Sequence, residues 1–544
     1  MPHKGAIMPD NDYCQVVLSV EGIQAYLFST GKLREMIGAS EITATYPQAV
    51  LDFCEEQGLH PVNEPQSGAS NWYVLLQAGA GMVRVLVPNA DIGRALLTKT
   101  GLWQTENYPG LPLYGTHIPC QWSNDGLNRA YQKALEIIAR KRATQARPPH
   151  AVWPFCRIAP LDGLPAVTKD KDEYISAVSH SRRKKDLLTA ARDKFKALVG
   201  DELARLLPGV ELCWAEDMDE MVENAPVQKI ALLHMDGNDL GRIFRNTRDR
   251  ETTKKSPCAD YVQEMLQLSN LVDEANKAAF AQAMSAIVKE DLLSPREPLD
   301  RYVVPARPLV LGGDDLTVIV RADLAFTFAD AYAAAFEQAT KDRGQAMSVG
   351  GGMVIMPSGY PFTRAFALAE KLTDSAKRLT AGLEQRPSSL DYVILTNDMN
   401  RDLDTLREYS YQTTDKSARL TGKPFVCGRP AAKSDVTIGA AAPYQPDATL
   451  TNVIKDSLWL HKNLSHSQLR PAIDACRRGR SDGKIAYSKL HENLKRNLGD
   501  SGRNLPSFER IFPQGFFLPG KGKEKPYTLL GDYIELGQLL AKNR

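Results

Sequence analysis

The sequence predicts an α+β protein that contains two copies of a β-α-β-β-α-β unit, each a ferredoxin-like domain, together with helical regions. Two observations indicate this fold class. The same order of strand-like and helix-like apolar patterns occurs twice, and each copy has two short apolar runs joined at glycines, as in a hairpin. The length of 544 residues also exceeds what one hydrophobic core supports, so we expect about three or four domains.

The composition is that of an ordinary globular protein, with 43% apolar and 24% charged residues. The formal net charge of +2 gives no global indication of nucleic-acid binding, so such a role depends on local patches. No apolar run is long enough to span a bilayer and the N-terminus lacks a signal-peptide pattern, so we expect a cytoplasmic protein without a membrane partner. The eight cysteines are scattered without a CxxC pair, which indicates reduced thiols.

Residues 1–148 contain the first copy. A strand is predicted over 15–20, followed by a helical pattern over 23–56 in which Gly31 and Gly38 are candidate breaks. The remaining elements are a hairpin over 71–88 that turns at Gly79 to Gly81, a helix near 90–100, a strand near 111–121 and a helix over 124–146.

Residues 226–400 contain the second copy in the same order. Its predicted elements are a strand over 229–236, a helix over 258–290, strands over 302–311 and 316–322, a helix over 324–341, a strand over 347–356, a helix over 361–383 and a strand over 389–397. The two middle strands flank Gly312 and Gly313 as a hairpin. We interpret residues 149–225 as a basic, helical insert and residues 401–544 as a helical domain.

The hairpin of the second copy reads "RPLVLGGDDLTVIVR" over residues 307–321. Asp314 and Asp315 lie side by side in an otherwise apolar hairpin, where they repel each other and lose hydration. A divalent cation would offset this cost. We expect Gly312 and Gly313 to adopt positive φ in the turn and to let a phosphate chain approach the backbone. Strand alternation predicts that the two carboxylates point to opposite faces or nearly so.

A third carboxylate, Asp236, ends the first strand of the same copy. Oxygen ligands beside a phosphate substrate suit magnesium or manganese. Two such ions promote in-line attack of a hydroxyl on a phosphate. We therefore predict Asp236, Asp314 and Asp315 as catalytic residues and, together with Gly237, as metal ligands.

The first copy lacks this set. Its hairpin reads "QAGAGMVRV", which has the glycines without carboxylates, and the end of its first strand offers only Glu21. We expect the first copy to be catalytically inactive and to help shape the nucleotide site as a packing partner.

The final helix of the second copy contains "ALAEKLTDSAKRL". Lys377 in this run is either a solvated lysine of an amphipathic helix or a point charge that reaches the γ-phosphate. The basic run 239–255 is interpreted as a loop that is either merely solvated or steers a nucleotide or RNA electrostatically. The predicted nucleotide-binding residues are Gly237, Asn238, Asp239, Gly241, Gly312, Gly313 and Lys377.

Several motifs resemble, in order from about residue 15 to 430, the large polymerase-like subunit of type III CRISPR effector complexes. These motifs are "EGIQAYLFSTGKLREMIGAS", "LLHMDGNDLGRIF", "VLGGDDLTVIV", "MSVGGGMVIMPSGYPFTRAFALAEKLTDSAK" and "RLTGKPFV". The resemblance implies a degenerate first palm domain (1–148), an intervening helical domain (149–225), an active second palm domain with the GGDD site (226–400) and a helical C-terminal domain (401–544). It also implies synthesis of cyclic oligoadenylate from ATP with two magnesium or manganese ions when target RNA is bound.

The resemblance carries over to particular residues and partners. Asp236 matches the metal-binding aspartate of the first strand, Asp314 and Asp315 match the hairpin carboxylates, and Lys377 matches the lysine of the final helix. The implied partners are guide and target RNA and the other effector subunits. Their contacts would lie in the basic segments 182–196 and 242–255 and at Lys521, Lys523 and Lys525.

Three departures from the family pattern lead to further expectations. No His-Asp pair precedes the first strand, and "WPFCRIAPLDGLPAV" resembles the remnant of a four-cysteine zinc site with Cys156 alone. We therefore expect no DNase activity and no structural zinc. The family often has Asp-Gly-Asp where this chain has Asp236-Gly237-Asn238-Asp239, so Asp239 is a candidate for the displaced carboxylate.

Three functions remain open at this point. The leading hypothesis is a nucleotidyl transferase that joins ATP units. The second is a non-catalytic RNA-binding scaffold subunit of the effector complex, and the third is a stand-alone diguanylate-cyclase-like enzyme that uses GTP. The intact set of Asp236, Asp314 and Asp315 favours an enzyme, because the first copy shows what a decayed site looks like.

Overall fold

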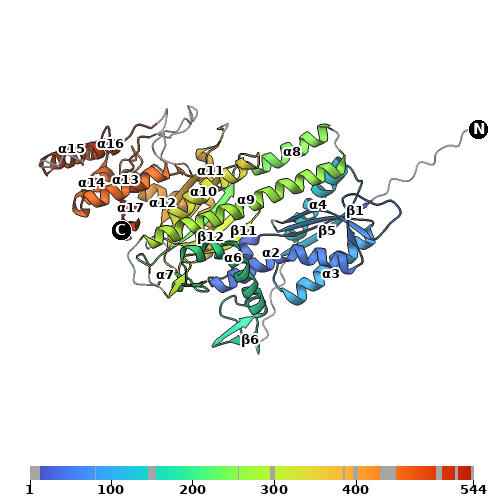
Figure 1. Ribbon diagram of the computed structural model, residues 1–544. Coiled ribbons are helices and arrows are strands. Elements are labelled where there is room, and N and C mark those ends of the chain that lie inside the picture. The colour runs from blue at the N-terminus through green and yellow to red at the C-terminus, as the bar shows by residue number, and fades with distance from the viewer. Residues whose placement is uncertain are drawn as a thin grey trace, which may run out of the picture. The chain divides into compact units, whose positions relative to one another are not determined.

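The structure is a computed structural model (Figure 1) that describes residues 13–79, 81–144, 155–223, 225–254, 257–293, 300–383, 386–395, 402–428, 449–497, 505–520 and 525–540. The chain forms two compact units, residues 1–197 with 239–274 and residues 198–238 with 275–544. Sheets and helices are mixed along the chain, so the predicted α+β class is confirmed. In the described part of the chain, no helix is both long enough and apolar enough to cross a membrane.

The first unit contains the sheet of the first copy. Its elements are β1 (Tyr13–Val20), α1 (Ile23–Leu27), α2 (Leu33–Glu56), β2 (His60–Pro61), β3 (Trp72–Gly79), β4 (Met82–Val87), α3 (Ala90–Asn107), β5 (Leu113–Cys120) and α4 (Asn124–Thr144). The strand order is β2-β3-β4-β1-β5, with β1 antiparallel to both β4 and β5. This is the predicted ferredoxin-like order with one short strand added at the edge.

The helical pattern after β1 breaks at one of its two glycines. Gly31 lies between α1 and α2, whereas Gly38 lies inside α2, so the second predicted break is wrong. A Cβ atom at position 38 would collide with the main chain of Arg182. Gly38 therefore allows close packing between two segments of the first unit.

The region interpreted as a helical insert also contains strands, which corrects that prediction. Its elements are β6 (Ala166–Asp170), β7 (Glu173–Ser176), α5 (Ala177–Arg182), α6 (Lys185–Leu206), β8 (Glu211–Cys213) and α7 (Met218–Val222). β6 and β7 form an antiparallel hairpin. The boundaries of the four predicted domains remain a prediction.

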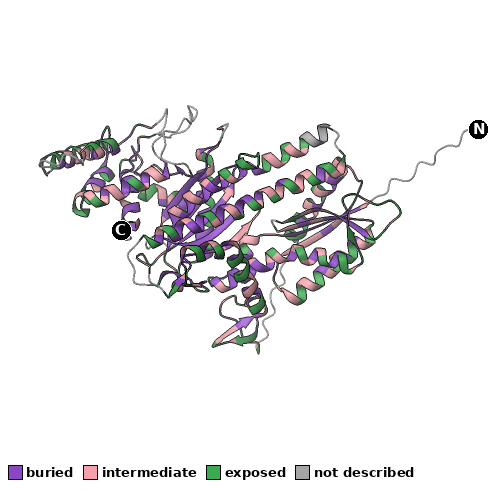
Figure 2. Cartoon of the chain, viewed as in Figure 1, coloured by how far each residue is buried: buried purple, intermediate pink, exposed green. Residues whose placement is uncertain are grey.

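The second unit contains the sheet of the second copy, in the order β11-β12-β9-β13-β14-β15. The elements of this copy are β9 (Ile230–Gly237), α8 (Leu240–Lys254), α9 (Cys258–Leu292), β10 (Arg301–Val303), β11 (Ala306–Gly312), β12 (Asp315–Arg321), α10 (Ala325–Asp342), β13 (Val349–Met356), α11 (Phe362–Leu379) and β14 (Ser389–Ile394). Strands β9, β12 and β13 are buried almost throughout (Figure 2), as expected for central strands covered on both faces.

Two predicted elements of this copy differ from the structure. The run predicted as one strand over 302–311 divides into β10 and β11 around Pro305, because proline cannot donate a ladder hydrogen bond, and β10 pairs instead with β8. The basic run 239–255 was expected to be a loop, but Leu240–Lys254 form helix α8. Arginine and lysine are good helix formers, so a high charge density did not exclude a helix.

The C-terminal region is mainly helical, as predicted. Its elements are α12 (Leu403–Ser410), β15 (Phe425–Val426), α13 (Leu450–Asn463), α14 (His466–Arg478), α15 (Arg480–Asn497), α16 (Leu505–Ile511) and α17 (Leu530–Leu540). Lys423 joins the segment before β15 to α17, because its buried Nζ lies 2.7 Å from Glu535 Oε2. Lys521 and Lys523 lie outside the described residues.

Candidate active site

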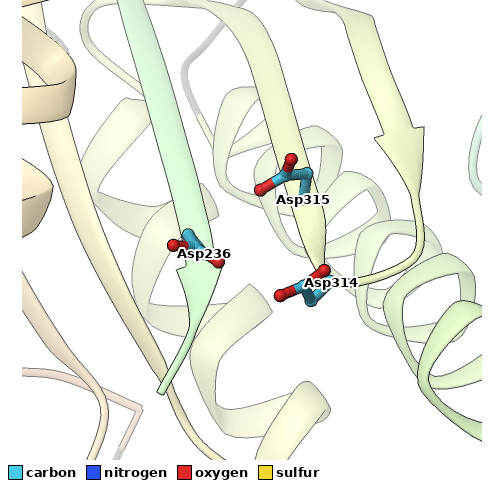
Figure 3. A group of neighbouring side chains, drawn as sticks. All are labelled: Asp236, Asp314 and Asp315. Carbon is cyan, nitrogen blue, oxygen red and sulfur yellow. The ribbon is translucent and has the colours of Figure 1, made fainter. Parts of the chain in front are cut away.

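Three carboxylates meet at one edge of the second sheet. Asp236 lies near the end of β9, Asp314 lies in the hairpin turn, and Asp315 begins β12 (Figure 3). Leu316 pairs with Met235 across β12 and β9, and this register sets Asp315 beside Asp236. One oxygen from each carboxylate lies within 4.8 Å of the others, and all three residues are half-buried. Among the described residues, this is the one cluster of three or more such side chains that could hold a metal ion.

The turn between β11 and β12 differs in two details from the prediction. Gly313 has φ of 59°, whereas Gly312 ends β11, pairs with Asp315 and has no positive φ. Gly313 and Asp314 thus form a two-residue loop whose first position favours glycine. Because Asp314 lies in the turn, strand alternation does not govern its direction. Both carboxylates point toward the end of β9 (Figure 3), so the prediction of opposite faces is wrong.

Burial and mutual repulsion oppose ionisation of the hairpin carboxylates. Burial, followed by the charges of Asp314 and Asp236, raises the pKa of Asp315 to about 7. Burial and the charge of Asp236 raise the pKa of Asp314 to about 6. The positive charge of Lys377 offsets part of both shifts. A bound cation would lower the free energy of these carboxylates in their ionised form, because its positive charge offsets their repulsion.

Lys377 is the cation that contacts this group. From α11, its Nζ pairs with the Asp236 carboxylate and donates to the carbonyl oxygen of Gly237 at 3.0 Å. A Cβ atom on Gly350 of β13 would lie 2.5 Å from Lys377 Cγ. The absence of a side chain at position 350 therefore makes room for the stem of Lys377. The sequence alone did not predict this role of Gly350. The run "VGGGM" over 349–353 was nevertheless a signal that a backbone or side chain approaches closely.

The residues after Gly237 lie in two different environments. Asn238 is 4% exposed, its N–H donates to Ser348 O at 2.8 Å, and its Nδ2 donates to Ser348 Oγ at 2.9 Å. Asp239 has φ of 59° and its carboxylate accepts from Arg242 at 3.3 Å. Asp239 and Gly241 belong to the first compact unit, whereas the three carboxylates belong to the second. Asp239 is not part of the carboxylate cluster.

Two buried polar residues at the turn were missed in the sequence interpretation. Asn276 of α9 donates through Nδ2 to Gly313 O at 3.0 Å and to Asp315 O at 3.1 Å. The hydroxyl of Tyr332 from α10 donates to Asn276 Oδ1 at 2.9 Å. Neither residue is exposed. In the sequence, the signal for Asn276 was an asparagine at an apolar position of a long predicted helix, because a buried amide needs hydrogen-bond partners.

The first copy has a different set of contacts at the equivalent place. Its turn has Gly79 with φ of 146° and Gly81 with φ of 72°. Glu21 follows β1, where it accepts from Ser19 Oγ at 2.9 Å and pairs with Arg142 at 3.3 Å. That this copy is catalytically inactive remains a prediction.

Residues 229–382 match the family model described as "Cas10/Cmr2, second palm domain". The matched segment contains Asp236, Asp314, Asp315 and Lys377. Residues 229–382 thus form a Cas10-like palm domain, and the resemblance drawn from the sequence is confirmed at this level. A search of curated proteins finds no match.

Three solved structures have a similar fold. A chain of the Csm1-Csm4 cassette in complex with cA4 aligns with a TM-score of 0.53 at 11% identity, over 99% of this chain and 71% of that chain. A chain of the cassette in complex with one ATP gives 0.51 at 12% identity, over 98% and 70%. Csm1 of T. onnurineus gives 0.53 at 12% identity, over 98% and 70%. At these identities the matches show the fold.

Proposed function

We propose that this chain is a nucleotidyl transferase that converts ATP into a cyclic oligoadenylate, as the polymerase-like subunit of a type III CRISPR effector complex. The observation that carries the proposal is the cluster of Asp236, Asp314 and Asp315, with Lys377 beside it, in a domain that matches the Cas10/Cmr2 second palm. The similar chains from cassettes with cA4 and with one ATP support the choice of substrate and product.

The donor set fits a hard divalent cation. Carboxylate oxygens are the ligands that magnesium and manganese prefer, and the Gly237 carbonyl is a further oxygen close to Asp236. Three ionised carboxylates and one lysine leave a net charge of −2, which the raised pKa values of Asp314 and Asp315 reflect. Bound divalent ions supply charge neutralisation at the phosphate and a more nucleophilic hydroxyl.

The chain's own residues divide the remaining tasks. Asp236, Asp314 and Asp315 hold the cations. Gly313, which has no side chain and has a positive φ, lets the phosphate chain approach the turn. Lys377 reaches the acidic group from α11, so its ammonium can contact a phosphate next to the cations. Gly237, Asn238 and Gly312 lie beside these residues in the chain and line the proposed nucleotide site, to which Asp239 and Gly241 are also proposed to contribute.

We also propose that the chain acts with other effector subunits and with guide and target RNA. The structure changes which basic residues are candidates for RNA contact. Arg183 is only 8% exposed and pairs with Glu35, Asp170 and Glu173, so it serves the fold of the first unit. On α8, by contrast, Arg242 is 62% exposed and Arg245 is exposed as well. Phosphate contacts from α8 would bind RNA with little base preference and steep salt dependence.

The test is to incubate the purified chain with each labelled nucleoside triphosphate and magnesium, alone and reconstituted with its partner subunits and complementary RNA. A product from ATP supports the proposal, and a product from GTP favours the diguanylate-cyclase-like alternative. No product in the full complex with RNA favours the scaffold. Equal turnover with and without complementary RNA rejects RNA gating.

A further inference from the structure

We propose that Asn276, held in place by Tyr332, is a positioning residue that fixes the Asp314–Asp315 turn for cation binding. The inference rests on the proposed function of this turn as a metal site. Asn276 touches no carboxylate oxygen in the described contacts, so it acts through the backbone that carries Asp314 and Asp315.

The first step is where the amide binds. Asn276 Nδ2 has two hydrogens, and its two acceptors are the carbonyl oxygens of Gly313 and Asp315, at 3.0 and 3.1 Å. These carbonyls lie one before and one after Asp314 in the chain. The amide thus ties the peptide unit before Asp314 and the peptide unit after Asp315 to helix α9.

The second step is what holds the amide. Tyr332 donates its hydroxyl to Asn276 Oδ1 at 2.9 Å and is itself fully buried. Its ring lies in a row with Phe328 and Phe336 along α10, at centroid distances of 6.3 and 6.1 Å. Because the hydroxyl occupies the amide oxygen, the NH₂ group must face the turn. Both donors and the acceptor of the Asn276 side chain are therefore used.

The third step is why this turn needs to be held. Asp314 and Asp315 carry like charges next to Asp236, and Gly313 offers the loop many backbone conformations. A turn tied only by its hairpin ladder could relieve the repulsion by moving its carboxylates apart. The two bonds from Asn276 oppose that movement, so the carboxylates stay close enough to share a cation. We call Asn276 and Tyr332 together the clamp. The structure thus predicts that loss of the clamp weakens cation binding more than it weakens the fold.

The first copy supplies a partial counterpart. Tyr46 of α2, also fully buried, donates to Gly81 O of the turn at 2.6 Å. In both copies, a helix that lies between the first strand and the hairpin in the sequence therefore anchors the hairpin turn. The bracketing of an aspartate by two bonds belongs to the second copy, which is the copy that has carboxylates to position.

The experiment compares Asn276→Leu, Asn276→Asp and Tyr332→Phe with Thr340→Val as a matched control. Thr340 is also fully buried on α10, and its hydroxyl bonds to Phe336 O at 2.9 Å and to the Met347 N–H at 3.2 Å. For each variant, Mn²⁺ affinity is measured by electron paramagnetic resonance without nucleotide. The melting temperature and the kcat and KM for ATP are measured as well.

We expect Asn276→Leu and Asn276→Asp to lose about tenfold or more in Mn²⁺ affinity and in kcat, with KM changed by less than about twofold. Tyr332→Phe should show a smaller loss in the same direction, and it serves as the test if the Asn276 variants do not fold. Thr340→Val should lower the melting temperature while leaving Mn²⁺ affinity unchanged. Excess Mn²⁺ should restore part of the turnover of the Asn276 variants.

The proposal is overturned if the clamp variants bind Mn²⁺ as tightly as Thr340→Val does. If the wild-type chain binds Mn²⁺ through Asp314 and Asp315 but makes no nucleotide product, the proposed function fails while the clamp is still tested by affinity. If replacing Asp314 and Asp315 leaves Mn²⁺ binding unchanged, the metal site and the clamp are both rejected.

Discussion

The two copies of the β-α-β-β-α-β unit have the same strand order but differ at their hairpin turns. In the first copy the sheet runs β3-β4-β1-β5, and in the second it runs β11-β12-β9-β13. The first turn has glycines without carboxylates, whereas the second places Asp314 and Asp315 beside Asp236. The sheet therefore forms without the acidic group, and the acidic group adds repulsion that the fold does not need.

The difference between the two copies supports the proposal that the carboxylates serve chemistry, because the fold does not depend on them. Burial raises the pKa of both hairpin carboxylates, so in the ionised state they cost folding free energy. In the first copy Tyr46 anchors the turn, whereas the second copy has Lys377, Gly350 and the Asn276–Tyr332 pair around its turn. Several independent elements of the second copy thus converge on one cluster.

The largest effect is expected from Asp314→Ala combined with Asp315→Ala. If the cluster holds the catalytic cations, loss of two ligands removes several kcal/mol of transition-state stabilisation, or about a thousandfold or more in kcat. The melting temperature should be unchanged or slightly higher, because repulsion is removed. Labelled ATP with magnesium measures turnover, and calorimetry measures stability. Asp236→Asn should behave similarly in the turnover assay, and unchanged product from the double variant would contradict the catalytic assignment.

A smaller effect is expected from Lys377→Ala, with Lys371→Ala as the control on an exposed position of the same helix. A hydrogen bond to a charged group contributes about 1.5–3 kcal/mol, so we expect kcat/KM for ATP to fall about 10- to 100-fold. The control should lie within about twofold of wild type. Equal activity of the two variants would mean that Lys377 pairs with Asp236 without contributing to substrate binding or turnover.

How much of this site the sequence predicts depends on the range of the interactions. Asp236, Asp314 and Asp315 were predictable because each lies at a strand end or turn that local apolar patterns mark. Asn276 was not, because its partners lie 37 to 56 residues further along the chain. The role of Gly350 was also hidden, because it depends on how closely α11 packs on β13. The helix α8 was missed because a charged surface helix and a charged loop have similar compositions.

A still smaller effect should appear in the pH dependence of stability. Folding raises the pKa of Asp315 to about 7 and that of Asp314 to about 6, from about 3.9 when unfolded. Between these values the folded chain binds more protons than the unfolded chain, so the free energy of unfolding falls as pH rises. The slope is at most about 1.4 kcal/mol per pH unit for each carboxyl.

The measurement is the melting temperature in EDTA from pH 5 to pH 8, for wild type and for Asp314→Asn with Asp315→Asn. The wild-type curve should fall more steeply, and magnesium should raise the melting temperature more at pH 8 than at pH 5. Asp532, whose pKa burial raises to about 7, contributes with the same sign to both chains and cancels in the comparison. Parallel curves would show that the hairpin carboxylates do not titrate in this range.

The smallest effect is expected from Glu21→Gln in the first copy. Glu21 follows β1 much as Asp236 ends β9, but its side chain pairs with Arg142, which is 58% exposed. Exposed ion pairs contribute about 0–1 kcal/mol, so the melting temperature should shift by no more than a few degrees. Turnover and Mn²⁺ affinity should remain at wild-type values, because no second carboxylate accompanies Glu21 at its turn. If Glu21→Gln instead lowered turnover as strongly as Asp236→Asn, the first copy would be contributing to the chemistry, and the contrast between an active and a decayed palm would have to be abandoned.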